Sequence, residues 1–476
     1  MNLRPQATPP VRARLAERYV SPERPRTAML PAMRFRERAA RLPLLLAFVA
    51  LAAIPLAIPA AAAEAPNSLG LDATYAVSAT LRWNAGKLVV SSAAHVTNST
   101  DEAIPGFTFN FLPAKIGQIQ VQQVLVGEAA ATWRRDDQNV IVDLVEPLQP
   151  GGEATITIGY TATFATKPTN KKFLFEKKAG YVTAYRWIPW LSKRYSFKTP
   201  TFGEPWVTQA TREVSVKLNS DNPAVKFATS GQLVASEGGT EEYVAHDVRD
   251  FNFSASPNYR VFSETYAGVQ FDYYTVELSR SNLQSLTRSA YDKFTELVGN
   301  YPYSRLVVAE TANGEGQESP GMIWIPRGTT KAGRKFLVRH EIAHQWFYAV
   351  VGNDQAKEPF ADEALAELLT RTIVGHRDSR CGETTLDRSV YDYGASCYYE
   401  AVYVQGDQYL NEYRERVGND AFWQGIRLYY ERYAFKIGGT LELLNTLDEV
   451  APEGLGGGHE ERFPSLFPPP EEPPPG

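Results

Sequence analysis

The stretch FLVRHEIAHQWFYAV, from Phe336 to Val350, decides how the second half of this chain is read. Its apolar residues recur at helical spacing, which predicts a helix over residues 336–350. Residues four apart share one face of a helix, so the imidazoles of His340 and His344 can bind one metal ion. Glu341, one residue along, can reach a water at that ion without being a ligand. The stretch therefore predicts a metal centre with its own general base.

The alternative is a half-buried helix that carries two ordinary histidines. The whole chain has 6 histidines, and two of them fall at this spacing in an otherwise apolar helix that would bury them. Buried polar groups need partners, and a bound metal ion supplies one for both rings. We therefore favour the metal centre over the structural alternative.

A catalytic zinc site needs a third protein ligand and an open fourth position. The metzincin arrangement would place a glycine at 347 and a histidine at 350, but the chain has Phe347 and Val350, which excludes that class. Glu363 follows His344 in the segment PFADEALAE (residues 359–367), which is typical of the start of a second helix. The predicted ligands of one Zn²⁺ per chain, with other divalent ions left open, are His340, His344 and Glu363.

Three segments resemble the aminopeptidase N and leukotriene hydrolase family of gluzincin zinc enzymes. The first is HEIAHQW (residues 340–346) followed by the glutamate of DEALAEL (residues 362–368). The second, GQESPGMI (residues 316–323), resembles that family's Gly-Ala-Met-Glu-Asn exopeptidase motif. The third, VYVQG (residues 402–406), is similar to its Tyr-Glu-Lys-Gly segment. The resemblance is strongest in the zinc motif and weakest in the first half of the chain.

The resemblance implies a zinc peptidase, and more specifically an aminopeptidase. Glu341 would act as the general base, and the Tyr403 hydroxyl would stabilise the oxyanion. Glu318 would bind the free α-amine of the peptide substrate. The backbone of the neighbouring residues could pair with the substrate as an edge strand, and these predicted substrate-binding residues are Gly316, Gln317 and Glu318.

The chain also departs from the family pattern, which keeps other functions open. Gln317 replaces the methionine of the exopeptidase motif and Ser319 its asparagine. Little ordered chain is expected after Glu449, so the chain would be a short member without the family's C-terminal helical domain. A zinc endopeptidase with an open cleft is therefore the main alternative. A non-catalytic peptide-binding module is a weaker one, because all three ligands and the base are present.

The segment before the zinc motif has the pattern of an all-β domain over residues 64–265. Short alternating stretches predict strands, separated by turn residues such as those of PGG (residues 150–152). The aromatic stretch YRWIPW (residues 185–190) does not alternate and is expected to be a loop packed against a neighbour. The fold class is therefore α+β and multidomain, with an N-terminal β-sandwich or saddle. The predicted strands cover residues 75–83, 87–90, 140–144, 154–160 and 213–218.

From residue 266 to 452, helical periodicity predicts a thermolysin-like α+β catalytic domain. A strand is expected at residues 306–309 and an edge strand at residues 322–325. Beyond them, residues 453–476 are rich in glycine and proline, so we expect a disordered tail. The helices are predicted at residues 283–298, 336–350, 364–374, 398–416 and 421–433.

The first 63 residues have the layout of a basic extension followed by a signal peptide. Arginines crowd the sequence up to Arg41, and residues 42–63 carry no charge. The small residues at 61–63 favour cleavage before Glu64. The apolar run is also close to the ~20 residues that span a bilayer, so an uncleaved membrane anchor stays open. We expect an exported protein that is secreted, periplasmic or held at the cell surface.

Two further features of the composition bear on the compartment and on partners. The only cysteines, Cys381 and Cys397, lack the spacing of a redox or zinc-finger motif, and export favours a disulfide between them over two free thiols. The net charge of −5 gives no basic field that would attract nucleic acid. The expected partner is a peptide or protein substrate.

Overall fold

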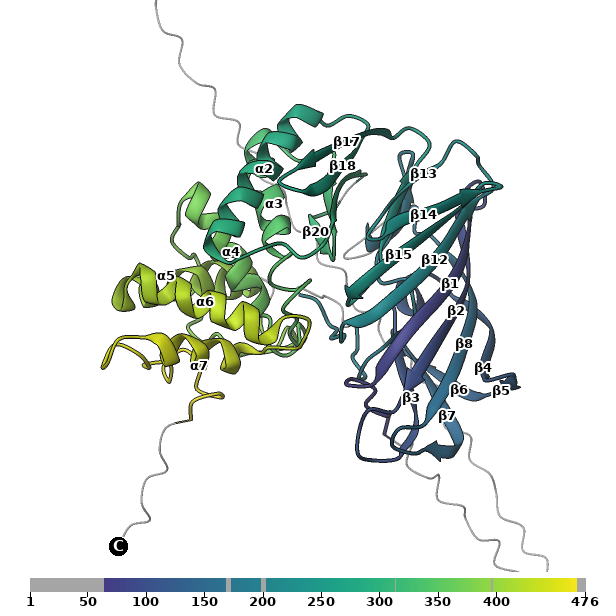
Figure 1. Cartoon of the computed structure of the whole chain (residues 1–476), viewed down its shortest axis with the longest axis horizontal. Helices are drawn as coiled ribbons and strands as arrows, with labels where there is room; N and C mark the ends of the chain where they lie inside the picture. The colour runs from purple at the N-terminus through teal and green to yellow at the C-terminus, as the bar shows by residue number, and fades with distance from the viewer. Residues whose placement is uncertain (1–63, 168–172, 198–202, 313, 395–396, 469–476) are drawn as a thin grey trace, which may run out of the picture. The chain divides into compact units, whose positions relative to one another are not determined.

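The first half of the chain is built almost wholly from strands in the computed structural model (Figure 1). The structure describes residues 64–167, 173–197, 203–312, 314–394 and 397–468. The expected signal peptide or anchor and the last residues of the expected tail lie outside these ranges. Within them, no helix is both long enough and apolar enough to cross a membrane.

The largest element is an eight-stranded sheet in which β1 and β12 pair in parallel and all other neighbours pair antiparallel. Along β1, Tyr75, Val77, Ala79 and Leu81 are buried and alternate with more exposed residues, as the period of two in the sequence predicts. Across the sheet the order is β14 (Gln232–Glu237), β15 (Thr240–Val248), β12 (Thr211–Ser220), β1 (Asp72–Arg82), β2 (Lys87–Thr97), β8 (Glu153–Thr163), β4 (Gln120–Val126) and β5 (Ala129–Ala130).

Two four-stranded sheets complete this half, and their buried side chains share one core with the large sheet. The short helix α1 (Pro113–Ile116) follows β3. One sheet has the order β11 (Trp190–Leu191), β3 (Ile104–Asn110), β7 (Asn139–Leu148) and β6 (Thr132–Asp136). The other has the order β13 (Lys226–Thr229), β16 (Phe253–Ser256), β10 (Tyr181–Ala184) and β9 (Phe175–Lys178).

The aromatic stretch at residues 185–190 is buried against a neighbour, as predicted. The ring of Tyr185 lies 5.8 Å from that of Trp206 and 5.7 Å from that of Trp324, measured between centroids. Trp324 belongs to the second half of the chain, yet it is part of the same hydrophobic core as the β-sheets. The two halves therefore pack directly against each other through buried apolar side chains.

The second half begins with a five-stranded sheet, and two predictions about it are wrong. Its order is β17 (Arg260–Tyr266), β18 (Val269–Thr275), β19 (Arg305–Thr311), β21 (Met322–Pro326) and β20 (Gln317–Ser319). Because β17 pairs with β18 over its whole length, it belongs to this half, and the boundary predicted at 265/266 moves to before β17. Because β20 covers its outer side, β21 is an interior strand rather than the predicted edge.

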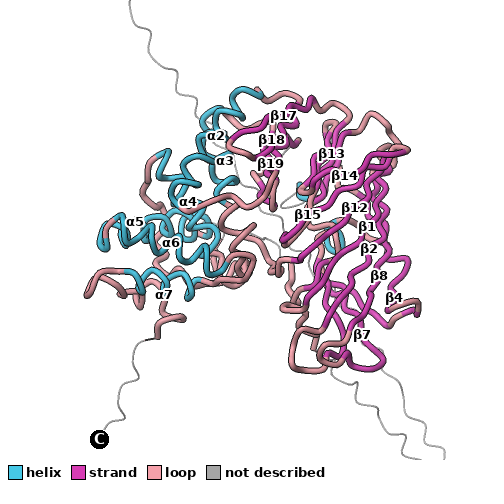
Figure 2. Tube along the Cα trace, in the orientation of Figure 1, coloured by secondary structure: helices cyan, strands magenta, loops and turns pink. Residues whose placement is uncertain are grey.

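The helices of the second half gather beside this sheet (Figure 2). The segment predicted as one helix over residues 398–416 contains a π-helical stretch, η2 (Glu400–Gln405), before an ordinary α-helix. One helix, α7, was not expected. The helices are α2 (Arg280–Leu297), α3 (Lys331–Ala343), α4 (Phe360–Val374), α5 (Gly406–Val417), α6 (Asn419–Tyr433) and α7 (Thr440–Val450).

The helix predicted over residues 336–350 ends earlier, with α3 at Ala343. His344 is its C-cap, and the chain then makes buried turns in which Tyr348 adopts a φ of 119°. The buried guanidinium of Arg249, from the first half of the chain, donates to the carbonyl oxygens of Ala349 and Val350. The predicted helix is too long because these turn residues are apolar and buried, like the residues on the buried face of a helix.

The prediction of a disordered tail is wrong for residues 453–468. Phe463 is fully buried, with its ring 4.9 Å from that of Phe360 at the start of α4. His459 is also buried and contacts the carboxylate of Asp448 at 2.9 Å. Phe463, with Leu466 and Phe467 beside it, packs this segment onto the core of the second half, which the glycine- and proline-rich composition does not reveal.

Candidate active site

One cavity, of about 540 Å³, brings together all the residues predicted for catalysis, metal binding and substrate binding. Helix α3 supplies His340 and Glu341, and its C-cap is His344; α4 supplies Glu363, and η2 supplies Tyr403. Strand β20 and the residue before it supply the predicted substrate-binding groups. The eight residues are Gly316, Gln317, Glu318, His340, Glu341, His344, Glu363 and Tyr403.

The three predicted ligand atoms form an equilateral triangle. The Nε2 atoms of His340 and His344 are 3.3 Å apart, and each lies 3.3 Å from Oε2 of Glu363. Ligand atoms 2.0 to 2.1 Å from a tetrahedral zinc ion lie about 3.3 to 3.4 Å from one another. The spacing of these donor atoms therefore fits a zinc ion, with a fourth position left for water or substrate.

A buried carboxylate also lies near the Nδ1 atom of each histidine. The Nδ1 atom of His344 lies 2.7 Å from Oδ1 of Asp362, and that of His340 lies 3.5 Å from Oε2 of Glu367. Asp362 and Glu367 are both buried and both on α4. A carboxylate that takes the Nδ1 proton leaves Nε2 free for a metal and orients the ring. The Asp362 contact is such a hydrogen bond, whereas the Glu367 contact is a longer ion-pair contact without one. Sequence inspection missed both residues, although they lie one before and four after Glu363, on adjoining positions of the same helix.

A second group of possible ligands overlaps the first. Glu318, Glu341 and His344 also place donor atoms within 4.8 Å of one another. That group would use the predicted base as a ligand and would leave His340 without a role. The triangle of His340, His344 and Glu363 accounts for both histidines and for the carboxylates near their Nδ1 atoms, so it remains the predicted set of metal ligands.

Burial shapes the acid–base properties of the site. It raises the pKa of Glu341 to about 7, although His340 and His344 oppose the shift. Burial alone would raise the pKa of Glu363, but hydrogen bonds from the two histidines lower it below its ordinary value. A carboxyl with a pKa near 7 suits proton transfer at neutral pH, and a readily ionised one suits a metal ligand.

The loop before β20 lies directly against the predicted base. A Cβ atom placed on Gly316 would come within 2.1 Å of Oε1 of Glu341. Only a glycine lets the backbone approach the carboxylate this closely. The sequence predicts Gly316 as a substrate contact, and the structure adds that it leaves room for Glu341.

Glu318 is one of two carboxylates that face each other in the cavity. The side-chain amide of Gln317 donates to Oε2 of Glu318 at 2.8 Å and to Oε1 of Glu204 at 2.7 Å. The amide of Gln355 donates to the other oxygen of Glu204 and to Asp362. Burial and the nearby charge of Glu204 raise the pKa of Glu318 well above its ordinary value. Sequence inspection missed Glu204, which lies outside all three segments that carry the family resemblance.

The replacement of asparagine by Ser319 has a structural explanation. Its hydroxyl donates to Asp250 at 2.8 Å and accepts from the side chain of Asn252 at 2.9 Å. Both partners come from the first half of the chain. Ser319 therefore helps hold β20 against the β-sheets, and it is not among the residues that line the cavity.

Tyr403 points toward the ligand triangle from the π-helical stretch. Its hydroxyl donates to Oε1 of Glu363, and its ring stacks on that of His340 at 5.5 Å between centroids. Burial and the charge of Glu363 raise its pKa well above the ordinary value, so the hydroxyl stays protonated. It can therefore act as a hydrogen-bond donor at the metal centre.

The predicted disulfide is confirmed, because Cys381 and Cys397 are bonded to each other. Cys397 stands just before Tyr398, which together with Tyr399 and Tyr403 lines the cavity. The disulfide therefore joins the loop after α4 to the segment that carries these tyrosines.

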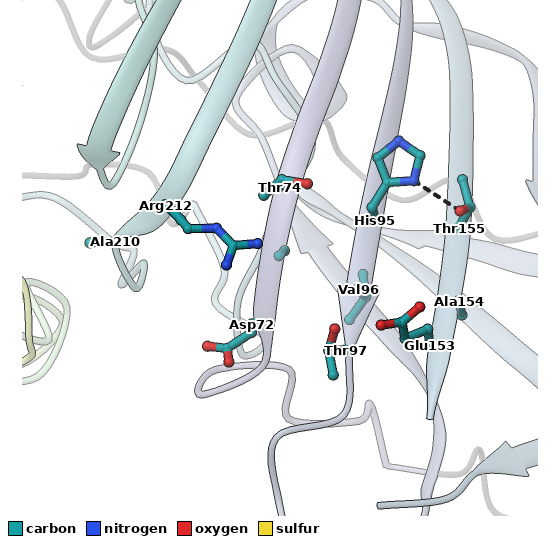
Figure 3. Close-up of a pocket in the computed structure, with 11 residues that line it drawn as sticks. Asp72, Thr74, His95, Val96, Thr97, Glu153, Ala154, Thr155, Ala210 and Arg212 are labelled. Atoms are coloured by element: carbon teal, nitrogen blue, oxygen red, sulfur yellow. Dashed lines mark hydrogen bonds between the residues drawn. The ribbon is translucent and has the colours of Figure 1, made fainter. Parts of the chain in front are cut away.

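A different hollow lies on the outer face of the large sheet (Figure 3). His95 on β2 and Thr155 on β8 are joined there by a hydrogen bond of 3.0 Å. Asp72, Glu153 and Arg212 line it as well. These side chains come from regular strands, and His95 and Glu153 are exposed, so the hollow has the character of a solvated sheet face.

No protein-family model matches the chain, and no curated protein matches it either. Solved structures do match, and the similarity extends over most of both chains. An M1 zinc metallopeptidase from Deinococcus radiodurans is 18% identical, with a TM-score of 0.62 over 86% of this chain and 96% of that chain.

Two related structures contain bound molecules. A glutamate-to-alanine variant of the Deinococcus radiodurans enzyme, bound to a Tyr-Ser-Ala substrate, is 17% identical, with a TM-score of 0.62 over 86% of this chain and 98% of that chain. A two-domain M1 zinc metallopeptidase variant bound to L-arginine is 18% identical, with a TM-score of 0.61 over 80% and 93%. The described part of this chain has the fold of the M1 zinc metallopeptidases.

Proposed function

We propose that this protein is a zinc-dependent peptidase that removes residues from the free N-terminus of a peptide. The observation that carries the proposal is the 3.3 Å triangle of His340, His344 and Glu363 beside the buried carboxylate of Glu341. Zinc, when bound, supplies a Lewis acid that polarises a carbonyl and lets a water lose its proton near neutral pH. The fold shared with the M1 zinc metallopeptidases supports the same reaction.

The side chains of this chain would divide the remaining work. Glu341 takes the proton of the attacking water and passes it to the leaving amine. Tyr403, whose hydroxyl donates to Oε1 of Glu363 in the structure, would turn this hydrogen bond to the oxyanion as the oxyanion forms. Peptide-bond hydrolysis needs no further reactant, because water supplies both the hydroxyl of the new carboxyl group and the proton of the new amine.

The two facing carboxylates of Glu204 and Glu318 favour an aminopeptidase over an endopeptidase. A protonated α-amine is the ligand that such a pair fits, because its positive charge relieves the repulsion between them. The amide of Gln317 donates to one oxygen of each carboxylate and so fixes their separation. An endopeptidase substrate has a neutral amide at this place, which carries no positive charge to offset the repulsion between the two carboxylates.

The test compares an L-aminoacyl arylamide with the same compound after N-acetylation, using purified protein loaded with zinc. We expect the free amine to be hydrolysed far faster, and the preference to collapse in Glu318→Gln. Glu415→Gln, which alters an exposed carboxylate of α5, should retain it. Equal rates on both compounds would establish an endopeptidase, and no hydrolysis of either would reject the peptidase.

We also propose that the protein is exported. The disulfide between Cys381 and Cys397 supports this, because disulfides persist in oxidising compartments. Intact-mass measurement of the protein from its native cell shows whether the N-terminal segment is removed. A mass that starts at Glu64 supports a cleaved signal, whereas retention of residues 42–63 in a membrane fraction supports an anchor.

A further inference from the structure

The hydroxyl of Tyr398 is buried in the active-site cavity with no acceptor among the described residues. Only 3% of the residue is exposed, and its oxygen forms no hydrogen bond there. The ring is held by Tyr393 and Tyr403, whose ring centroids lie 5.8 Å and 5.9 Å away. Leaving a buried polar group unpaired costs roughly 1–3 kcal/mol. A buried hydroxyl kept at that cost calls for an explanation.

The hydroxyl lies beside Gly203, and Tyr398 and Gly203 both line the cavity. A Cβ atom placed on Gly203 would lie 2.5 Å from it, and Gly203 precedes Glu204, one of the two facing carboxylates. Among the nearby acidic groups, Glu363, a predicted metal ligand, raises the pKa of the Tyr398 hydroxyl most strongly, and Glu204 comes next. Tyr398 therefore lines the cavity between the residue that precedes Glu204 on one side and Tyr403 on the other.

The hydroxyls of Tyr403 and Tyr398 differ in whether their proton is already donated in a hydrogen bond. That of Tyr403 already donates to Glu363, whereas that of Tyr398 has its proton uncommitted among the described residues. The two tyrosines are five residues apart, and the i to i+5 pattern of the intervening π-helical turn brings such residues toward one face. In an α-helix, residues three and four apart would share that face instead.

We propose that the Tyr398 hydroxyl donates a hydrogen bond to the carbonyl oxygen of the scissile bond, as a second oxyanion donor beside Tyr403. This inference rests on the proposed peptidase function, and it adds a catalytic residue to it. The free hydroxyl is a neutral donor that costs no reorganisation when the oxyanion forms. Removing one such donor typically lowers kcat by about 10²–10³-fold.

The variant is Tyr398→Phe, with Tyr393→Phe as the matched control. Tyr393 lies in the same aromatic cluster, but its hydroxyl donates to the carbonyl oxygen of Thr385 at 3.1 Å and it does not line the cavity. We expect Tyr398→Phe to keep its zinc and to melt no lower than the wild type, because the unpaired hydroxyl is removed, while kcat falls about 10²-fold with KM little changed. Tyr393→Phe should lower the melting temperature and leave kcat unchanged.

Binding of a phosphinic dipeptide, whose tetrahedral phosphorus oxygens imitate the oxyanion, separates this inference from the proposed function. Calorimetry on zinc-loaded protein should show at least tenfold weaker binding in Tyr398→Phe than in the wild type. An unchanged Kd overturns the assignment whatever the activity of the wild type. Weaker binding supports it even if the arylamide assay rejects the aminopeptidase, and a wild type that does not bind the probe overturns both.

Discussion

The Nδ1 atom of His344 lies 2.7 Å from a carboxylate oxygen of Asp362, the residue immediately before the predicted ligand Glu363. One helix thus supplies both a predicted metal ligand and the group that would orient a second one. A carboxylate that keeps the proton on Nδ1 would present the lone pair of Nε2 to a metal ion. Asp362 in turn accepts a hydrogen bond from Gln355 at 2.7 Å, which fixes its own orientation.

Replacing Asp362 should weaken metal binding without removing a ligand. We expect Asp362→Ala to bind zinc about 10–100-fold more weakly, because the His344 ring loses its orienting partner. Competition against a chelator of known affinity measures this. Asp420→Ala, which removes an exposed acid from the first turn of α6, is the control. Equal zinc affinity in both variants would show that the Asp362 contact does not tune the metal.

Gly316 should be essential for catalysis because of its contact with Glu341. A Cβ atom at this position pushes the carboxylate away, and a misplacement of about 1 Å can cost ~10²-fold in rate. We expect Gly316→Ala to keep its zinc and lose about 10²-fold in kcat. The control is Gly328→Ala, because a Cβ atom there meets nothing within 4 Å. Unchanged kcat in Gly316→Ala would mean that Glu341 acts from another position.

The buried carboxyl of Glu341 should make the stability of the metal-free protein depend on pH. Burial raises its pKa from 4.5 to about 7 in the folded state. The folded protein therefore holds this proton more tightly than the unfolded chain does. The contribution is fully present below pH 4.5 and is lost as the pH rises toward 7, on the order of 3 kcal/mol in total.

Glu341→Gln removes this titratable group alone. Comparing it with the wild type therefore separates the effect of Glu341 from that of the other buried groups. In the presence of a chelator, urea unfolding should show the variant gaining stability relative to the wild type between pH 5 and pH 8. The expected sign follows from the wild type having to bury a charge at pH 8 that the variant lacks. A difference in stability between the two proteins that does not change with pH would contradict the raised pKa of the Glu341 carboxyl.

The segment after α7 should contribute to folding through Phe463. Its ring is fully buried against Phe360 and Tyr409, at 4.9 Å and 5.0 Å between centroids. Phe463→Ala should lower the free energy of unfolding by about 3–5 kcal/mol, as for other buried phenylalanines. Leu455→Ala, at a residue 39% exposed, should cost much less. Equal stability of the two variants in urea would restore the expectation of a disordered tail.

Much of the site could be predicted because its residues are close in sequence. His340, Glu341 and His344 lie within about one helical turn, so helix geometry alone places them together. The period of two along β1 likewise predicts which face of Tyr75 to Leu81 is buried. Local periodicity is visible in a sequence without knowledge of the contacts between distant segments.

The remaining features depend on contacts between distant segments. Glu204 meets Gln317 across more than a hundred residues, and Arg249 binds the carbonyl oxygens of the turn after α3. Neither partner carries a local signal, because a glutamate in a loop and an arginine after a strand are ordinary. The early end of α3 and the buried segment after α7 were missed for the same reason.

Zinc content measured side by side in Glu341→Gln and Glu363→Ala tests the central assignment of ligand and base most directly. Both proteins are purified with zinc, dialysed without a chelator, and analysed for metal per chain against the wild type. If Glu341 is the base and Glu363 a ligand, Glu341→Gln should hold about one zinc per chain and lose several orders of magnitude in hydrolysis, and Glu363→Ala should hold little zinc. Loss of zinc from Glu341→Gln together with full zinc in Glu363→Ala would contradict this assignment.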